Sequence, residues 1–523
     1  MVVKMTAEFD FFKNLYKKIP SQTKVCFVSA MVTGLLTHMY MLTHKLPNWD
    51  DVNCFSNAGV TTLVGRWLLE YLKDIPTSWS NPWLNGSIAI LLIAVSCCLV
   101  VAVLELKSMT SAVLVPVLFM TFPSVASTMT FMFTIDMYML GMLFAILAVY
   151  LTKKYKYGFL AGSVLLICSL GIYQAYICFA ITLFIVWIFE EALQKKEIKA
   201  LFISIGKAVG VLAVSVILYI LVSKLLCPNM SDSNYAGTAE MGQISLTELP
   251  RLTARSYKRI LEYFILKPFS YISRAGWVVN ILVCLMLGLC FVWLMAVKKM
   301  WKNKISFAVC VLTMLAAPLG MAFIYVMSPQ ANYSTLMMYQ YVLVYVLLLL
   351  FAEHICKEQV KVFAKKTIGI VTAALLVLTA VFHYTVTQEA YFRMDLSMTR
   401  VTEYYNRLLT RLELEGYEPG EAFLIMGHSQ AGDDKLLPPE HYSMEDEKFE
   451  DFSGISPEYG ILTAGVRENF MRIYFGLEVP SVSDGDKETI LQSEEFKEMP
   501  IYPKDGCVQK INDVWIIKIS EGQ

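Results

Sequence analysis

Long apolar runs separated by short polar stretches dominate the pattern of this chain of 523 residues. A helix needs about 20 mostly apolar residues to cross the roughly 30 Å hydrocarbon core of a bilayer. About eleven segments approach this length and are predicted to span a membrane. They are Val25–Leu42, Gly86–Leu106, Ala112–Val125, Ile135–Leu151, Phe159–Leu170, Tyr173–Ile188, Phe202–Leu226, Val278–Val297, Phe307–Met327, Leu336–Phe351 and Thr367–Val386. The segments near Ala112, Phe159 and Tyr173 are short, which makes them candidates for broken, tilted or half-buried helices.

Composition agrees with a membrane protein. Hydrophobic residues make up 56% of the chain and charged residues 17%, whereas soluble domains average about 45–50% and about 25%. The formal net charge is zero, which gives no argument for a nucleic-acid partner. The first apolar run is long enough to span, and no small-residue cleavage site follows it. It is therefore predicted to remain as a membrane helix rather than to be a cleaved signal peptide.

Lysine placement predicts the orientation of these helices, because cytoplasmic loops of membrane proteins are enriched in Lys and Arg. Lysines precede the first span and also occur at each alternate loop. They are Lys4, Lys13, Lys17, Lys18, Lys24, Lys107, Lys153–Lys156, Lys195–Lys199, Lys298–Lys304 and Lys357–Lys366. This pattern predicts a multi-pass membrane protein with its N-terminus in the cytoplasm. Residues 1–24 are expected inside, residues 25–387 in the membrane domain, and the loops 44–85 and 227–276 outside.

The character of the chain changes after residue 387. Glu389–Glu415 has helical periodicity and is followed by Gly416, a common residue after a helix end. Short strands are predicted at Ala422–Met426 and Val514–Ile519, and a further helix near Glu468–Phe475. Residues 388–523 are therefore predicted to form a small extracytoplasmic α/β domain of roughly 130 residues.

Two adjacent carboxylates, Asp50 and Asp51, lie just beyond the outer end of the first predicted span, and Arg66 follows them. A charge at this boundary can stay ionised, whereas at the bilayer centre it costs several kcal/mol. One interpretation is an ordinary solvated loop. However, the loop also contains many aromatic and apolar residues, which favours a packed element resting on the membrane.

An acidic pair with a nearby cation suits glycosyl transfer from a phosphate leaving group. A carboxylate is needed to take the proton of the attacking hydroxyl, and cations are needed to stabilise the departing phosphate. An alternative is that Asp50 and Asp51 hold a divalent cation such as Mg²⁺ or Mn²⁺, which prefers oxygen ligands. No Cys/His spacing typical of a zinc site is present.

The outer loop 227–276 contains several cations, against the usual charge bias. Arg255, Lys258 and Arg259 lie in a stretch with the pattern of an amphipathic helix. One interpretation is an interfacial helix whose cations contact lipid head groups. The other is a docking site in which one or two of these cations hold a lipid-linked phosphate.

Three further residues are candidates for the same site. Asp136 lies at the outer end of the fourth predicted span, and acids near a membrane are functional candidates. The alternative is an interfacial acid bonded to a neighbouring helix. Tyr173 and Gln174 fall at an outer turn between two short spans, where they could bind a sugar or cap helix ends.

Several motifs in this order resemble one family. They are L-P-N-W-D-D (46–51), G-R-W (65–67), F-P-S-V-A-S-T (122–128), F-T-I-D-M-Y (133–138) and S-L-G-I-Y-Q-A-Y (169–176). With them the chain resembles the bacterial polyprenyl-phosphate-dependent glucosyltransferases, the O-antigen glucosyltransferases of serotype conversion. The resemblance covers roughly residues 30–190 best and is weak over the terminal domain.

The resemblance implies a GT-C architecture, a place in the bacterial cytoplasmic (inner) membrane and an inverting single displacement. It also implies a polyprenyl-phosphate-sugar donor, such as undecaprenyl-phosphate-glucose, and a surface glycan acceptor. By carry-over Asp50 is the base, Asp51 assists or positions it, and Arg66 and Asp136 belong to the active site. The match does not fix which of the two adjacent acids abstracts the proton.

Two other functions remain open from the sequence. A flippase or transporter of lipid-linked sugars shares the many spans, although transporters commonly contain internal repeats and none is found here. A surface glycan polymerase is a second alternative, and it has no need of a large terminal domain.

Overall fold

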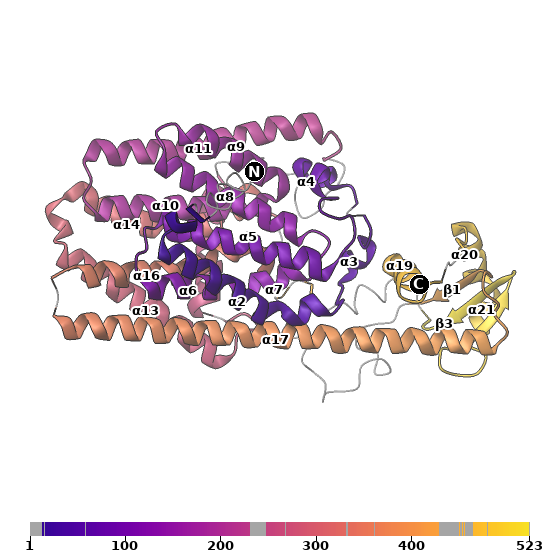
Figure 1. Ribbon diagram of the computed structural model, residues 1–523. Helices are drawn as coiled ribbons and strands as arrows, with labels where there is room; N and C mark the ends of the chain where they lie inside the picture. The colour runs from indigo at the N-terminus through magenta and orange to yellow at the C-terminus, as the bar shows by residue number, and fades with distance from the viewer. Residues whose placement is uncertain are drawn as a thin grey trace, which may run out of the picture.

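The computed structural model shows a long helical bundle with a small domain at one end (Figure 1). It describes most of the chain between residues 13 and 521. Residues 15, 58, 231–246, 267, 331–332, 360, 428–448, 450–451, 453, 456–463 and 478–479 lie outside the description. Most of the predicted cytoplasmic segment 1–24 and the middle of the predicted outer loop 227–276 are therefore outside it as well.

Nine helices in the described part of the chain are long and apolar enough to cross a membrane. They are α2 (Ser21–Thr43), α5 (Pro82–Val103), α8 (Ile135–Lys154), η2 with α10 (Gln174–Leu193), α11 (Ile198–Leu226), α13 (Arg274–Val297), α14 (Lys304–Met321), η7 with α16 (Tyr339–Lys357) and α17 (Val362–Leu414). The pair α6 (Met109–Thr121) and α7 (Pro123–Met129) makes a tenth if it counts as one bent span.

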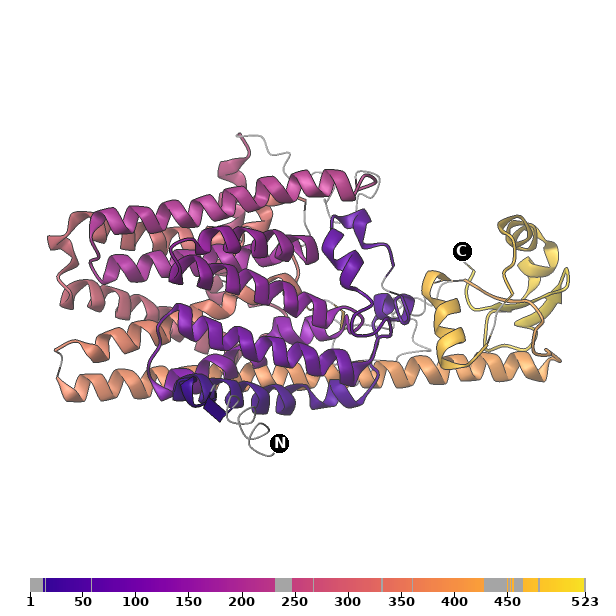
Figure 2. The ribbon, with the colours of Figure 1, turned by 45° about the horizontal axis from the view of Figure 1, so that its top comes forward.

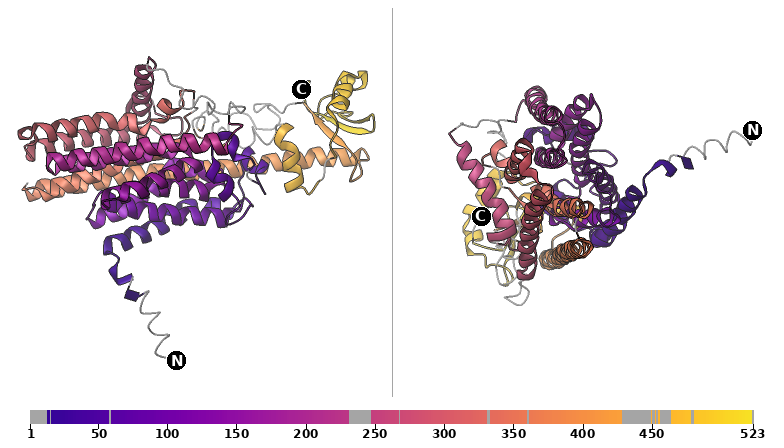
Figure 3. Two further views of the ribbon diagram at one scale, coloured as in Figure 1. Left: turned by 90° about the horizontal axis from the view of Figure 1, so that it is seen from above. Right: turned by 90° about the vertical axis from the view of Figure 1, so that its left-hand side faces the viewer.

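The eleventh predicted segment forms α9 (Gly158–Ile172), an apolar helix of only 15 residues. Each of the predicted apolar segments thus overlaps a helix, and the class of polytopic helical membrane protein is confirmed. The number of segments that cross the bilayer, and their orientation, remain predictions. Viewed down the bundle, the long helices appear nearly end-on and run roughly parallel (Figure 3).

The break between α6 and α7 brings polar groups into the bundle. The two helices meet at 45°, and Pro123 begins α7 because proline suits the first turn of a helix but not its interior. All seven residues of α7 are buried. Ser124 Oγ donates to the carbonyl of Thr335 at 2.5 Å. This short helix therefore places several buried hydroxyl groups inside the bundle.

Helix α17 is one continuous helix of 53 residues, although the sequence pattern suggested a span and then a separate helix. At 1.5 Å per residue it is about 80 Å long, far more than a bilayer requires. It runs along the bundle and continues to the C-terminal domain (Figures 1 and 2). The predicted domain boundary at residues 387 and 388 falls inside this helix.

The C-terminal domain contains a three-stranded sheet in the order β1-β3-β2. β1 (Phe423–Met426) is parallel to β3 (Val514–Lys518), and β2 (Val508–Ile511) is antiparallel to it. Its helices are α19 (Ala464–Tyr474), α20 (Asp484–Gln492) and α21 (Glu494–Glu498). The two predicted strands and the helix near residue 468 are confirmed, whereas the sequence analysis missed β2.

Short elements follow α2 at the end of the bundle that faces this domain (Figure 1). They are α3 (Trp49–Asn53), η1 (Thr61–Val64) and α4 (Trp67–Leu72). Val52 of α3 packs in one apolar cluster with Leu408 of α17 and Phe470 of α19. Asn469 Nδ2 also donates to Asn53 Oδ1 at 2.9 Å. The C-terminal domain therefore docks directly on the helix that carries the acidic pair.

The remaining described helices are short and lie between residues 249 and 337. They are α12 (Leu249–Leu261), the π-helix η4 (Glu262–Leu266), η5 (Met300–Lys302), α15 (Ile324–Met327) and η6 (Thr335–Met337). Helix α12 is amphipathic, as predicted, and buries Leu252, Ser256 and Ile260.

Candidate active site

The acidic pair lies on α3, a short helix fixed at its start by Asn48. The Asn48 side chain accepts a hydrogen bond from the backbone N–H of Asp51 at 2.8 Å, as expected of an N-cap asparagine. Its Nδ2 donates to Thr130 Oγ1 at 3.2 Å, just beyond α7. Asn48 is fully buried, so it ties the orientation of α3 to the bundle.

The carboxylate of Asp51 is buried and fully engaged. It forms an ion pair with Lys45 and accepts a hydrogen bond from Ser80 Oγ. Its Oδ1 also accepts the backbone N–H of Phe133 at 3.0 Å. Because these donors come from three separate parts of the chain and occupy the carboxylate oxygens, Asp51 is an anchor between those parts.

Asp50 has a different environment. It is half-buried, and no hydrogen bond or ion pair to its carboxylate is found within the described residues. Burial raises the pKa of this carboxyl above its ordinary value, the positive charge of Arg66 opposes the rise, and Asp51 adds to it. A partly desolvated carboxylate with open lone pairs and a cation in range has the properties of a general base.

Arg66 is held by two tyrosines. Its guanidinium donates to Tyr138 Oη at 2.7 Å and lies 4.9 Å from the centre of the Tyr173 ring. The rings of Tyr138 and Tyr173 stack with centroids 4.5 Å apart. The contact between the Arg66 guanidinium and the Tyr173 ring is a cation–π interaction, which is worth about 0.5–2 kcal/mol. The structure thus brings together Asp50, Arg66 and Tyr173, as the sequence analysis predicted for one site.

Gln174 supports the backbone that directly precedes Arg66 in the chain. Its Nε2 donates to the carbonyl of Val64 at 2.7 Å and to Tyr219 Oη at 2.9 Å, and Tyr219 in turn donates to the carbonyl of Gly65 at 3.1 Å. Gly65 has a φ of +73°, a conformation that favours glycine. Gln174 therefore neither caps a helix nor reaches into open space. It fixes the turn that aims Arg66.

Asp136 is buried in the first turn of α8. Its Oδ1 accepts the backbone N–H of Met137 at 2.9 Å. Its Oδ2 has no hydrogen-bond partner of good geometry among the described residues. The contacts found for this carboxyl do not join it to Asp50 or Asp51, although Tyr138 two residues later binds Arg66.

The three cations of α12, Arg255, Lys258 and Arg259, make contacts in the described part of the chain that do not include the acidic pair. Arg255 donates to the carbonyl of Pro329 at 2.6 Å, and Arg259 donates to that of Tyr333 at 3.2 Å. Lys258 is 72% exposed and lies 3.7 Å from Glu262. None of the contacts found in the described residues connects these cations to Asp50 or Asp51.

Several supporting residues were not identified from the sequence. Lys45 and Tyr138 lie inside the quoted motifs or directly beside them, so the motifs themselves were the signal. Ser80 gave none, because it lies 29 residues from Asp51 and outside every quoted motif. Phe133 begins the motif F-T-I-D-M-Y, but it lies 82 residues from Asp51 and nothing in the motif indicated that its backbone N–H binds this acid. Their roles follow only from the way the loops fold together.

The site does not suit a divalent cation. Within the described residues no group of three or more His, Cys, Asp or Glu side chains could hold a metal ion. The Asp51 oxygens are already bound by a lysine, a serine and a backbone N–H. Of the two adjacent acids, only Asp50 has carboxylate oxygens without a bonded donor in the described part of the chain, which favours acid–base chemistry over metal binding.

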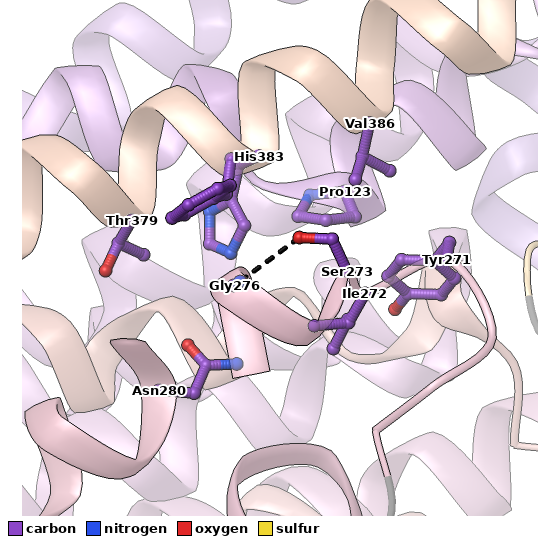
Figure 4. Close-up of a pocket in the computed structure, with 10 residues that line it drawn as sticks. Pro123, Tyr271, Ile272, Ser273, Gly276, Asn280, Thr379, His383 and Val386 are labelled. Carbon is purple, nitrogen blue, oxygen red and sulfur yellow. Dashed lines mark hydrogen bonds between the residues drawn. The ribbon is translucent and has the colours of Figure 1, made fainter. Parts of the chain in front are cut away.

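A separate small cavity lies between α13 and α17. Its volume is about 20 Å³, which is room for roughly one water molecule. Figure 4 shows its lining, with the His383 ring and the Asn280 amide facing the start of α13. This cavity is too small for a sugar, and it lies beside Pro123 rather than beside the acidic pair.

Comparison with known proteins identifies the family. The family model for glucosyl transferase GtrII matches residues 39–351, which include α3, Arg66, the Tyr138–Tyr173 stack and α12. No curated protein and no solved structure matches the chain. Because the family match covers more than half of the chain, the protein belongs to the glucosyl transferase GtrII family and is a membrane glucosyltransferase.

Proposed function

We propose that this protein transfers a glucosyl unit from a polyprenyl-phosphate-linked donor to a surface glycan on the extracytoplasmic face of the membrane, with Asp50 as the general base. The observation that carries this proposal is the contrast between the two acids. Asp51 is engaged by Lys45 and further donors, whereas Asp50 is half-buried and faces the charge of Arg66.

The proposed step is a single displacement with inversion. Asp50 accepts the proton of an acceptor hydroxyl while the oxygen of that hydroxyl attacks the anomeric carbon of the donor sugar. At the same time the bond from the anomeric carbon to the phosphate oxygen breaks. A base with a raised pKa is better matched to this proton than an ordinary aspartate. The proton ends on Asp50, and the electron pair of the broken bond ends on the departing phosphate.

Arg66 is the proposed partner of the leaving phosphate. Its guanidinium is held by Tyr138 and Tyr173, and the turn before it is fixed by Gln174. A cation that is already oriented stabilises developing negative charge without reorganising during the reaction. Lys258, Arg255 and Arg259 would act further out. The Lys258 side chain is 72% exposed and is therefore available to a lipid-linked phosphate.

The acceptor side is proposed to lie toward the C-terminal domain, which docks on α3 through Val52 and Asn53. A glycan that approaches Asp50 from outside the membrane would pass this domain. Asp136 remains a proposed active-site residue because its buried Oδ2 has no partner of good geometry in the described part of the chain.

The deciding experiment supplies purified protein with radiolabelled polyprenyl-phosphate-glucose and a surface glycan. Label appearing on the glycan supports the proposal. Label that only changes leaflet in a vesicle assay indicates a flippase, and lengthening of the glycan by whole repeat units indicates a polymerase. The anomeric configuration of the product distinguishes inversion from retention.

A further inference from the structure

A second cavity lies at the opposite end of the bundle from α3. It has a volume of about 340 Å³ and is formed where α5, α8 and α10 end. Its lining consists of Ala102, Glu105, Tyr150, Lys153, Lys154, Glu191 and Lys196. This volume falls in the usual range of small-molecule sites, and nothing in the catalytic proposal uses it.

Glu191 is the feature that points to a ligand. It is 6% exposed. Its Oε1 accepts hydrogen bonds from Trp187 Nε1 at 2.9 Å and from Lys196 at 2.8 Å, but its Oε2 has no partner among the described residues. A buried carboxylate oxygen without a partner costs free energy, so it calls for a donor from outside the chain.

The lining combines both signs of charge. Lys153 donates to the last carbonyl of α5, that of Val103, at 2.5 Å and pairs with Glu105 at 3.0 Å. Lys154 and Lys196 are both exposed, and Glu105 is 52% exposed. Three helix C-termini, which carry partial negative charge, also converge here. The cavity therefore suits a ligand with a cationic donor and an adjacent anion.

The cavity also lies at the membrane boundary. Ala102 is an exposed residue near the end of the candidate span α5, while Tyr155 and Tyr157 beyond α8 are 52% and 65% exposed. Exposed tyrosines of this kind gather at the level of lipid head groups. Head-group sites between helix ends near lysines are a known mode of lipid recognition.

We infer that this cavity binds the head group of phosphatidylethanolamine, a primary ammonium beside a phosphate. In this arrangement the ammonium donates to Glu191 Oε2 and to Glu105, while Lys154 and Lys196 contact the phosphate. A quaternary ammonium, as in phosphatidylcholine, has no N–H to donate. Phosphatidylglycerol has the phosphate but lacks the cation.

The test measures thermal unfolding of the full-length protein in nanodiscs of phosphatidylcholine, with and without added phosphatidylethanolamine or phosphatidylglycerol of the same acyl chains. Phosphatidylethanolamine is expected to raise the Tm by at least about 2 °C, as binding to the folded state requires. Phosphatidylglycerol is expected to leave it unchanged. Native mass spectrometry should show the retained lipid.

Variants place the effect at this cavity. Glu191→Gln should abolish the rise in Tm, and Glu105→Gln, at an exposed position that is safe for folding, should reduce it. Glu353→Gln is the matched control. Glu353 lies in a helix end at the same side, but its carboxylate is satisfied by Ser108 and Ser111, so the rise should persist. Equal rises with phosphatidylethanolamine and phosphatidylglycerol, or an unchanged rise in both cavity variants, would overturn the inference.

Discussion

Asp51 accepts a hydrogen bond from the backbone N–H of Phe133 at 3.0 Å, across 82 residues of sequence. This contact joins α3 to the turn before α8, which five residues later supplies Tyr138 to Arg66. One acid of the pair thus fixes the position of the loop, and its neighbour is the proposed base. The two carboxylates are adjacent in sequence but have different surroundings in the structure.

The first prediction separates these roles. Asp50→Asn should lower turnover by roughly 10²–10⁴-fold, the usual contribution of a general base, without changing the Tm. Asp51→Asn should lower stability by about 2 kcal/mol, because charge-assisted hydrogen bonds from Lys45 and Ser80 are weakened. Single-turnover transfer from a radiolabelled donor and thermal unfolding of both variants provide the measurements.

Two outcomes would contradict the roles proposed for Asp50 and Asp51. If Asp50→Asn retained turnover while Asp51→Asn lost it at unchanged stability, the base would be Asp51 and the assignment above would be reversed. Retained turnover in both variants would remove the acidic pair from catalysis altogether.

The second prediction concerns pH. Asp50 acts when ionised, so the acid limb of kcat/KM follows its pKa, which burial raises and Arg66 opposes. In Arg66→Gln the attraction is lost, the pKa of Asp50 rises further, and the acid limb should move to higher pH. Asp51→Asn removes a repulsion, which should move the limb to lower pH.

Lys73→Gln is the control for this titration. Lys73 is a cation of the same outer loop, but it pairs with Glu70 at 2.6 Å and is absent from the charges that act on Asp50. Its removal should leave the acid limb in place. A similar shift in Lys73→Gln and Arg66→Gln would mean that the net charge of the loop sets the pH profile.

The order of the motifs predicted Asp50, Asp51, Arg66 and Tyr173 for one site. In the structure Arg66 lies against the Tyr173 ring and its charge acts on Asp50, whereas the catalytic roles stay predictions. The difference between the two acids could not be predicted, because it depends on Ser80 and Phe133, which become neighbours only after folding. Gln174 was considered for sugar binding or capping, yet its partners are the backbone of Val64 and Tyr219.

The same limit applies to α17. The apolar stretch 367–386 and the amphipathic stretch 389–415 differ in pattern, and this difference suggested two elements. Neither glycine nor proline separates them, so the helix has no local reason to stop. That α17 is one continuous helix could therefore have been predicted from the sequence. The docking of the C-terminal domain on α3 could not.

The third prediction tests the turn that aims Arg66, using two glycines of the same loop. Gly65→Ala would place a Cβ 2.7 Å from Tyr219 Oη and 2.8 Å from Met230 Sδ. Gly59 has a similar φ of +68° but open space around it. Both changes incur about 1 kcal/mol of backbone strain, but only Gly65→Ala displaces the turn.

Transfer activity should therefore fall by roughly 10–100-fold in Gly65→Ala, since a misplacement of about 1 Å at a reacting group has effects of this size. Gly59→Ala should keep nearly full activity. The assay is kcat/KM for donor and acceptor at a temperature where both variants are folded. Equal losses in the two variants would show that strain alone, and not the position of Arg66, is responsible.

The fourth prediction tests the orientation in the membrane. Cys54 of the outer loop is a poor probe, because burial and the charges of Asp50 and Asp51 raise its pKa to about 12, and maleimides react with the thiolate. Ser56→Cys introduces a thiol at an exposed position of the same loop, and Lys156→Cys introduces one at the other end of the bundle.

An impermeant maleimide applied to intact cells should label Ser56→Cys and spare Lys156→Cys, which should react only after permeabilisation. This outcome follows from the lysine-rich loops, which are retained on the cytoplasmic side. The reverse pattern would place Asp50 and the C-terminal domain in the cytoplasm, where a surface glycan is not available. The donor would then have to be cytoplasmic, and the proposed acceptor would be excluded.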